Sequence, residues 1–107
     1  MSSRPNYTKP DKNQAQIVNE LRHLGFDVDI ICNLPGLYDL VVCGRKTFHN
    51  EDYLYINVPT CVRVEVKSKA GYLYPSELKY YESLQNPYSY IVAHSTKDVL
   101  EWFNGKQ

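Results

Sequence analysis

Apolar and polar positions follow two different periods along the 107-residue chain, and the changes of period predict its elements. Residues 11–24 place apolar side chains at helical spacing, and Gly25 follows as a stop. Residues 26–31 alternate apolar and acidic side chains, which predicts a half-exposed strand. Residues 37–43 are apolar almost throughout, a pattern typical of a central strand covered on both faces.

The second half of the chain continues the alternation of strands and helices. Residues 44–59 hold two strand-like stretches around a polar centre, which predicts a projecting hairpin or an extension of the flanking strands. Residues 61–66 predict another central strand, residues 76–85 a helix and residues 89–93 a strand, and Ser95 opens a last helix. The order α-β-β-β-α-β-α predicts one α/β domain with a mixed sheet flanked by helices.

Length, hydropathy and the cysteines together predict the bounds of the domain and its cellular location. Residues 1–10 are polar and rich in proline, so we expect a flexible N-terminus before a single domain over residues 11–107. The N-terminus has no apolar run, which argues against a secretory signal, and no apolar stretch approaches the length of a membrane span. Cys32, Cys43 and Cys61 lack the paired spacing of metal ligands, which favours buried free thiols. The predicted location is therefore a reducing cytoplasm.

The charge balance argues against a protein that holds nucleic acid by bulk electrostatics. Twelve basic and 12 acidic residues give a formal net charge of zero. A local basic surface remains compatible with this balance, although a solvated surface of mixed charge explains the same composition. The candidate nucleic-acid contacts are Lys69, Arg45, Lys46 and Lys79.

Ionised residues occupy the two predicted central strands, where an apolar residue would be favoured. Burying a carboxylate costs several kcal/mol unless a metal or a counter-charge compensates it. Asp39 lies in the first of these strands, and Glu65 and Lys67 share one face of the second, roughly 6–7 Å apart. Two carboxylates beside an ammonium group favour a magnesium site at which a bound water becomes a nucleophile. The plainer alternative is an ordinary ion pair across strands.

Three motifs together resemble a known enzyme family. They are Gly36-Leu37-Tyr38-Asp39-Leu40, Glu65-Val66-Lys67-Ser68 and Leu73-x-Pro75-Ser76-Glu77. In this combination the chain resembles the PD-(D/E)xK nuclease superfamily, and within it the virus-type replication-repair nuclease (VRR-Nuc) domains and Holliday-junction resolvases. The resemblance runs from about Gln14 to Phe103 and implies a restriction-endonuclease-like core.

The resemblance also implies roles for individual residues. Asp39 and Glu65 correspond to metal ligands, joined by the backbone carbonyl of Val66, and Lys67 corresponds to the catalytic lysine. The implied cofactor is Mg²⁺, for which Mn²⁺ can substitute. The implied partners are DNA, with branched DNA as one candidate, and a second copy of the chain in a homodimer. Residues 46–56 of the predicted hairpin are the candidate dimer contact.

The chain departs from the family pattern at several places. Tyr38 stands where the family has proline, and Gln14 stands where relatives carry a glutamate on the first helix. Three alternatives follow for the missing acid: one metal dominates, Glu20 on the flank of that helix substitutes for it, or the enzyme is slow. Glu77 takes the place of a glutamine, as a supporting site residue or as a first-turn acid favoured by the helix dipole. Four tyrosines flank the motifs and serve either in core and sheet-surface packing or in stacking against a base or sugar, namely Tyr53, Tyr55, Tyr72 and Tyr74.

These observations predict a Mg²⁺-dependent, structure-specific DNA endonuclease, with junctions among its candidate substrates. A metal-activated water would hydrolyse the phosphodiester, and the short chain favours recognition of DNA shape over a long sequence. One alternative is a catalytically weak or inactive nuclease fold that binds DNA or protein, which the glutamine at Gln14 keeps open. Another is a small α/β domain with a structural ion pair between Asp39 and Lys67.

Overall fold

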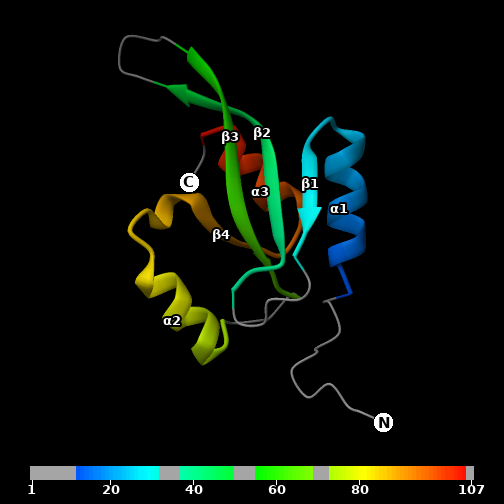
Figure 1. Cartoon of the computed structure of the whole chain (residues 1–107). Helices are drawn as coiled ribbons and strands as arrows, with labels where there is room; N and C mark the ends of the chain where they lie inside the picture. The colour runs from blue at the N-terminus through cyan, green and yellow to red at the C-terminus, as the bar shows by residue number, and fades with distance from the viewer. Residues whose placement is uncertain (1–11, 32–36, 50–54, 69–72, 106–107) are drawn as a thin grey trace.

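The computed structural model describes residues 12–31, 37–49, 55–68 and 73–105. The predicted flexible N-terminus, Cys32, the turn before Leu37, Lys69 and the tip of the predicted hairpin lie outside these residues. The elements in chain order are α1 (Gln14–His23), β1 (Asp27–Ile30), β2 (Leu40–His49), β3 (Tyr55–Val66), α2 (Pro75–Ser83), a 3-10 helix (Pro87–Ser89), β4 (Tyr90–Ala93) and α3 (Thr96–Phe103). The predicted α/β class and element order are confirmed (Figure 1).

The four strands form one mixed sheet in the order β1-β2-β3-β4. The β1–β2 and β2–β3 pairs are antiparallel, whereas β4 runs parallel to β3. A parallel pair needs a long crossover, and the segment that contains α2 provides it. The predicted mixed sheet is therefore confirmed, with β1 and β4 as its edges.

The core lies on one face of the sheet, which α1 and α3 cover together. Alternation sends every second residue of the strands to this face, and the buried members are Val28, Leu40, Val42, Val62, Val64 and Val66. They pack against Ile17, Val18 and Leu21 of α1 and against Val99, Trp102 and Phe103 of α3. The opposite face is only partly covered, since Val41 and Arg63 there are half-buried. The expectation of strands covered on both faces therefore holds for this core face throughout, and for the opposite face only toward the end of β3, where Glu65 and Lys67 are buried.

Two glycines sit where a side chain would disturb the fold. Gly25, which follows the C-cap residue Leu24 of α1, has a φ of 98°. Glycine adopts this left-handed conformation without strain, which explains the stop predicted there. Gly44 in β2 lies under the ring of Phe26, and a Cβ atom there would come within 2.3 Å of the Phe26 Cδ1 atom. The small residue lets Phe26 close the core beside Phe103, whose ring centroid is 4.8 Å away.

β2 and β3 continue past the rest of the sheet as a two-stranded ribbon (Figure 1). β1 pairs with β2 only as far as Cys43, and β4 pairs with β3 only over its last four residues, whereas β2–β3 pairing extends to His49 and Tyr55. The two descriptions of residues 44–59, a projecting hairpin and an extension of the strands, thus describe one feature. Pro59 fits this strand because it lies beyond β4, where none of the described residues pairs with the outer edge of β3.

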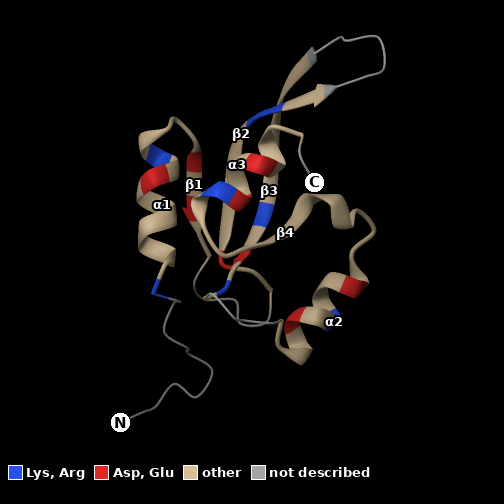
Figure 2. Cartoon of the chain, turned by 180° about the vertical axis from the view of Figure 1, so that it is seen from behind, with Lys and Arg blue, Asp and Glu red and all other residues tan. Residues whose placement is uncertain are grey.

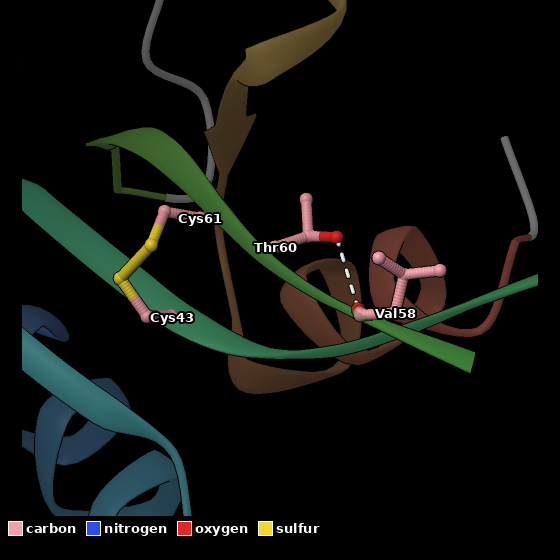
Figure 3. The surroundings of a disulfide bond; sticks show 4 residues. All are labelled: Cys43, Val58, Thr60 and Cys61. Atoms are coloured by element: carbon pink, nitrogen blue, oxygen red, sulfur yellow. Dashed lines mark hydrogen bonds between the residues drawn. A yellow bond between two sulfur atoms is a disulfide. The ribbon is translucent and has the colours of Figure 1, made fainter.

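A disulfide joins Cys43 and Cys61, which lie directly opposite each other in β2 and β3 (Figure 3). The prediction of free thiols in a reducing cytoplasm is therefore wrong, because disulfides persist in oxidising environments. The pairing has no local signal in the sequence, since 18 positions separate the two cysteines and only the strand register brings them together. In the described part of the chain, no helix is long and apolar enough to cross a membrane.

Candidate functional site

Asp39 lies directly before β2 and is held by both neighbouring strands. Its backbone N–H donates to the Val64 carbonyl at 3.0 Å, and its own carbonyl accepts the Ile31 N–H at 2.7 Å. The Asp39 carboxylate accepts the backbone N–H of Val66 at 2.8 Å. The carboxylate is thus fixed at the end of β3, beside the residue whose carbonyl is a predicted metal ligand.

Glu65 and Lys67 occupy the same end of β3 and are both buried, with 4% and 5% of their surface exposed. Alternation along the strand puts them on one face, and the Lys67 Nζ lies 3.4 Å from the Glu65 carboxylate. The Lys67 backbone N–H donates to the Ala93 carbonyl at 3.0 Å, which continues the pairing of β3 with β4. Lys67 is therefore anchored at the backbone as well as at its ammonium group.

Glu77 comes to this cluster from the first turn of α2. Its carboxylate oxygen Oε1 accepts a hydrogen bond from the Lys67 Nζ at 2.7 Å and another from the Tyr74 N–H at 2.8 Å. The second bond satisfies one of the free N–H groups at the start of the helix. Glu77 is thus a first-turn acid of α2, one of the two roles that the sequence left open, and it also contacts Lys67. Its role as a supporting site residue stays a prediction.

The buried acids change each other's protonation. Burial, then the negative charge of Asp39 and a hydrogen bond to Glu77, raises the pKa of Glu65 to about 9. Burial opposes ionisation of Glu77 as well, but its hydrogen bonds from Lys67 and Tyr74 outweigh this and lower its pKa. Burial would lower the pKa of Lys67, yet the hydrogen bond to Glu77 and the charge of Glu65 raise it. Glu65 and Glu77 thus both contact one ammonium group, and Asp39 adds negative charge near Glu65. The raised pKa keeps Glu65 protonated near neutral pH, and a further cation would favour its ionised form.

Tyrosine rings connect α2 to the sheet beside these acids. Tyr90 is 5% exposed, and burial followed by the charges of Glu65, Glu77 and Asp39 raises the pKa of its phenol. The ring centroids of Tyr80 and Tyr81 lie 6.1 and 5.3 Å from that of Tyr90. The Tyr90 ring therefore packs against the tyrosines of α2 and lies within reach of the charges of the acids, a position that the sequence did not single out.

Asn13 is a second residue that the sequence did not reveal. Its side-chain amide donates to the Lys67 carbonyl at 3.0 Å and to the His94 carbonyl at 2.7 Å. These bonds tie the start of α1 to the ends of β3 and β4, and Gln14 follows directly, 6% exposed, in the first helical turn. Asparagine before a helix suggests a cap, but Asn13 makes no side-chain capping bond, so its residue type gave the wrong signal.

The donor set suits a magnesium ion. Carboxylates of Asp39 and Glu65 and the Val66 carbonyl are hard oxygen ligands, and Mg²⁺ prefers a few of these together with water and phosphate oxygens. Among the described residues, no group of three or more histidine, cysteine, aspartate or glutamate side chains is arranged to hold a metal. Metal binding here would therefore depend on the carbonyl and on water, and would displace the proton of Glu65.

The other predicted site residues lie elsewhere. Glu20 is exposed, and its carboxylate accepts hydrogen bonds from Gln16 and Thr96. Arg45, on the ribbon, donates to Asn57.

The two remaining candidate lysine contacts differ in exposure. Lys46 is 8% exposed, and its ammonium group donates to the Trp102 carbonyl and lies 3.8 Å from the centre of a Trp102 ring. Lys79 is exposed on α2. Basic and acidic residues are interspersed over the chain (Figure 2), in agreement with its zero net charge.

Comparison with protein-family models, with curated proteins and with solved structures gave no match for this chain. The resemblance to the PD-(D/E)xK superfamily therefore depends on the motif residues and on the element order alone. Membership of that superfamily is accordingly a proposal.

Proposed function

We propose that this protein is a magnesium-dependent endonuclease that hydrolyses DNA phosphodiesters. The observation that supports this best is the contact of Lys67 with both Glu65 and Glu77 at the end of β3, where the Asp39 carboxylate accepts the backbone N–H of Val66. These residues come from three separate segments, so their meeting is a property of the fold and not of one local motif.

A purely structural ion pair explains this cluster less well. Lys67 needs one carboxylate to be neutralised, yet Glu65 and Glu77 both contact it, at 3.4 and 2.7 Å. The extra acid carries a cost, because burial and the charge of Asp39 raise the pKa of Glu65 to about 9. A bound cation would stabilise the ionised form of Glu65 and so offset this cost. An ion pair without a further cation leaves the cost uncompensated.

Each residue has a distinct role in the proposed chemistry. When bound, Mg²⁺ would lower the pKa of a water and polarise the phosphodiester. Asp39 orients the Val66 peptide through its N–H, which holds the Val66 carbonyl at the site. Glu77 holds the Lys67 ammonium group, whose positive charge would stabilise the negative charge that develops on the phosphate oxygens.

A catalytically weak or inactive nuclease fold that binds DNA or protein is the second candidate. Gln14 supplies no negative charge at the start of α1, and the two glutamates that contact Lys67 hold its ammonium group within the protein. Both observations would lower the activity of such a site without affecting the fold.

Cleavage of a supercoiled plasmid and of a four-way junction, with Mg²⁺ or Mn²⁺, distinguishes the two. We expect metal-dependent cutting that Lys67→Ala lowers about 100-fold or more. Asp39→Asn should have a similar effect, because the amide oxygen still accepts the Val66 N–H while the charge is lost. Lys97→Ala, at an exposed lysine of α3, is the matched control and should cut normally. Binding of DNA without cutting would support the second candidate.

The homodimer stays a prediction. The ribbon exposes Phe48 and Ile56, 44% and 51%, as a pair directly across β2 and β3, and Val58 is 38% exposed on the same face. An exposed apolar patch of this kind is compatible with a second copy of the chain.

A further inference from the structure

The ring of Tyr74 stands over the ammonium group of Lys67. The Nζ atom lies 4.1 Å from the ring centroid, the geometry of a cation–π contact. Tyr74 is nevertheless 61% exposed, whereas Lys67 below it is 5% exposed. An aromatic ring has two faces, so one face covers the ammonium group while much of the residue remains open to solvent.

The backbone of Tyr74 is held from both sides. Its N–H donates to the Glu77 carboxylate at 2.8 Å, and its carbonyl accepts the Leu78 N–H at 2.9 Å. Pro75, whose ring fixes φ, follows as the first residue of α2. The exposed ring is therefore carried by the start of a helix, a rigid base from which an aromatic side chain can make a defined contact.

Further exposed apolar residues continue from this ring along α2. Leu78 and Tyr81 follow Tyr74 by four and seven positions, which places them on the same side of the helix. They are 44% and 36% exposed. A row of exposed apolar side chains that begins at an ionised buried cluster is typical of a ligand-binding surface.

We propose that Tyr74 is a stacking platform for an unpaired nucleobase, and that the substrates of this site are single-stranded or locally unpaired DNA. This inference rests on the proposed nuclease function. In a duplex both faces of each base are covered by neighbouring bases, so only an unpaired base offers a face to a protein ring. The phosphate next to a base on Tyr74 would lie near Lys67. Tyrosines are also frequent in protein interfaces, but direct contact with Lys67 favours a ligand of the site itself.

Fluorescence of 2-aminopurine tests the proposal without cleavage. A single-stranded oligonucleotide that contains this base, and the same oligonucleotide annealed to its complement, are titrated with protein in Ca²⁺. Calcium accepts the same kind of oxygen ligands as Mg²⁺ in a looser geometry. We expect quenching with the single strand, unchanged in Tyr74→Phe. Tyr74→Leu should abolish the quenching and weaken single-strand binding about 5- to 150-fold, the range for loss of one base–aromatic stack.

Tyr88→Leu is the matched control, because Tyr88 is 86% exposed and precedes β4 at the end remote from Lys67. The proposal is overturned if Tyr74→Leu binds the single strand as wild type does, or if Tyr88→Leu causes an equal loss. In the first case the exposed ring belongs to another partner, such as a protein. Failure of the nuclease function gives a different result, namely quenching that depends on Tyr74 in a protein that cuts no DNA with Mg²⁺ or Mn²⁺.

Discussion

Removal of the Cys43–Cys61 disulfide should destabilise the protein by an amount that depends on the position of the two cysteines. The bond closes a loop across 18 positions of the chain, and the unfolded chain loses entropy in proportion to the logarithm of that length. A loop of this size corresponds to about 3 kcal/mol at 25 °C. For a domain near 100 residues, this is a fall of about 10–20 °C in Tm.

The double variant Cys43→Ser with Cys61→Ser removes the bond, and thermal and urea unfolding measure the loss of stability. Cys32→Ser is the matched control, because it removes a thiol without touching the bonded pair. A reductant should lower the Tm of the wild-type protein as much as the double substitution does, and should leave the double variant unchanged. Thiol titration of the unreduced, denatured protein should find one free cysteine of three.

Two results would contradict this prediction. One is a double variant no less stable than Cys32→Ser, which would mean that the bond does not constrain the unfolded chain. The other is a titration that finds three free thiols in the protein as isolated, which would remove the argument for an oxidising environment.

Proton binding, metal binding, packing and assembly can each be tested at a single residue. Because the pKa of Glu65 is raised from 4.5 to about 9, stability should fall as pH rises between these values, and Glu65→Gln should remove that slope in urea unfolding at several pH values. With Mg²⁺ at pH 8, Tm should rise for the wild type but not for Glu65→Gln, and equal rises would exclude Glu65 as a ligand. Gly44→Ala should cost about 1–3 kcal/mol, because the new Cβ meets the ring of Phe26, and a neutral result would mean that the ring moves freely. Phe48→Glu should shift sedimentation from dimer to monomer; a wild-type monomer would contradict the predicted homodimer.

The sequence was enough to predict which acids occupy the central strands, but not their contacts with residues from other segments of the chain. Alternation in β3 placed Glu65 and Lys67 on one face, as the 3.4 Å contact requires. The contact of Glu77 with Lys67 depends on how α2 docks, and the bonds of Asn13 depend on where α1 begins. Neither docking angle nor contact between distant segments is encoded in a local pattern.

For two residue types, lysine and cysteine, the sequence predicted the wrong surroundings for the same reason. Lysine is a residue type expected at the surface, yet β2 places Lys46 beneath α3, where its ammonium group contacts the ring and the backbone carbonyl of Trp102. Cysteines without a spacing motif suggested free thiols, yet the β2–β3 register sets Cys43 opposite Cys61. In both cases the surroundings of the side chain come from another segment of the chain.

Sequence alone was enough to predict the element order, the mixed α/β class and the ionised residues of the central strands, because hydrophobic periodicity is a local property of helices and strands. The fold was needed to show that Glu65 and Glu77 both contact Lys67 and that Asp39 binds the Val66 N–H beside them. It was also needed to show that Tyr74 covers the ammonium group and that two cysteines are bonded. These contacts join residues from separate segments of the chain. They are set by strand register and by helix docking, which depend on how the whole core packs.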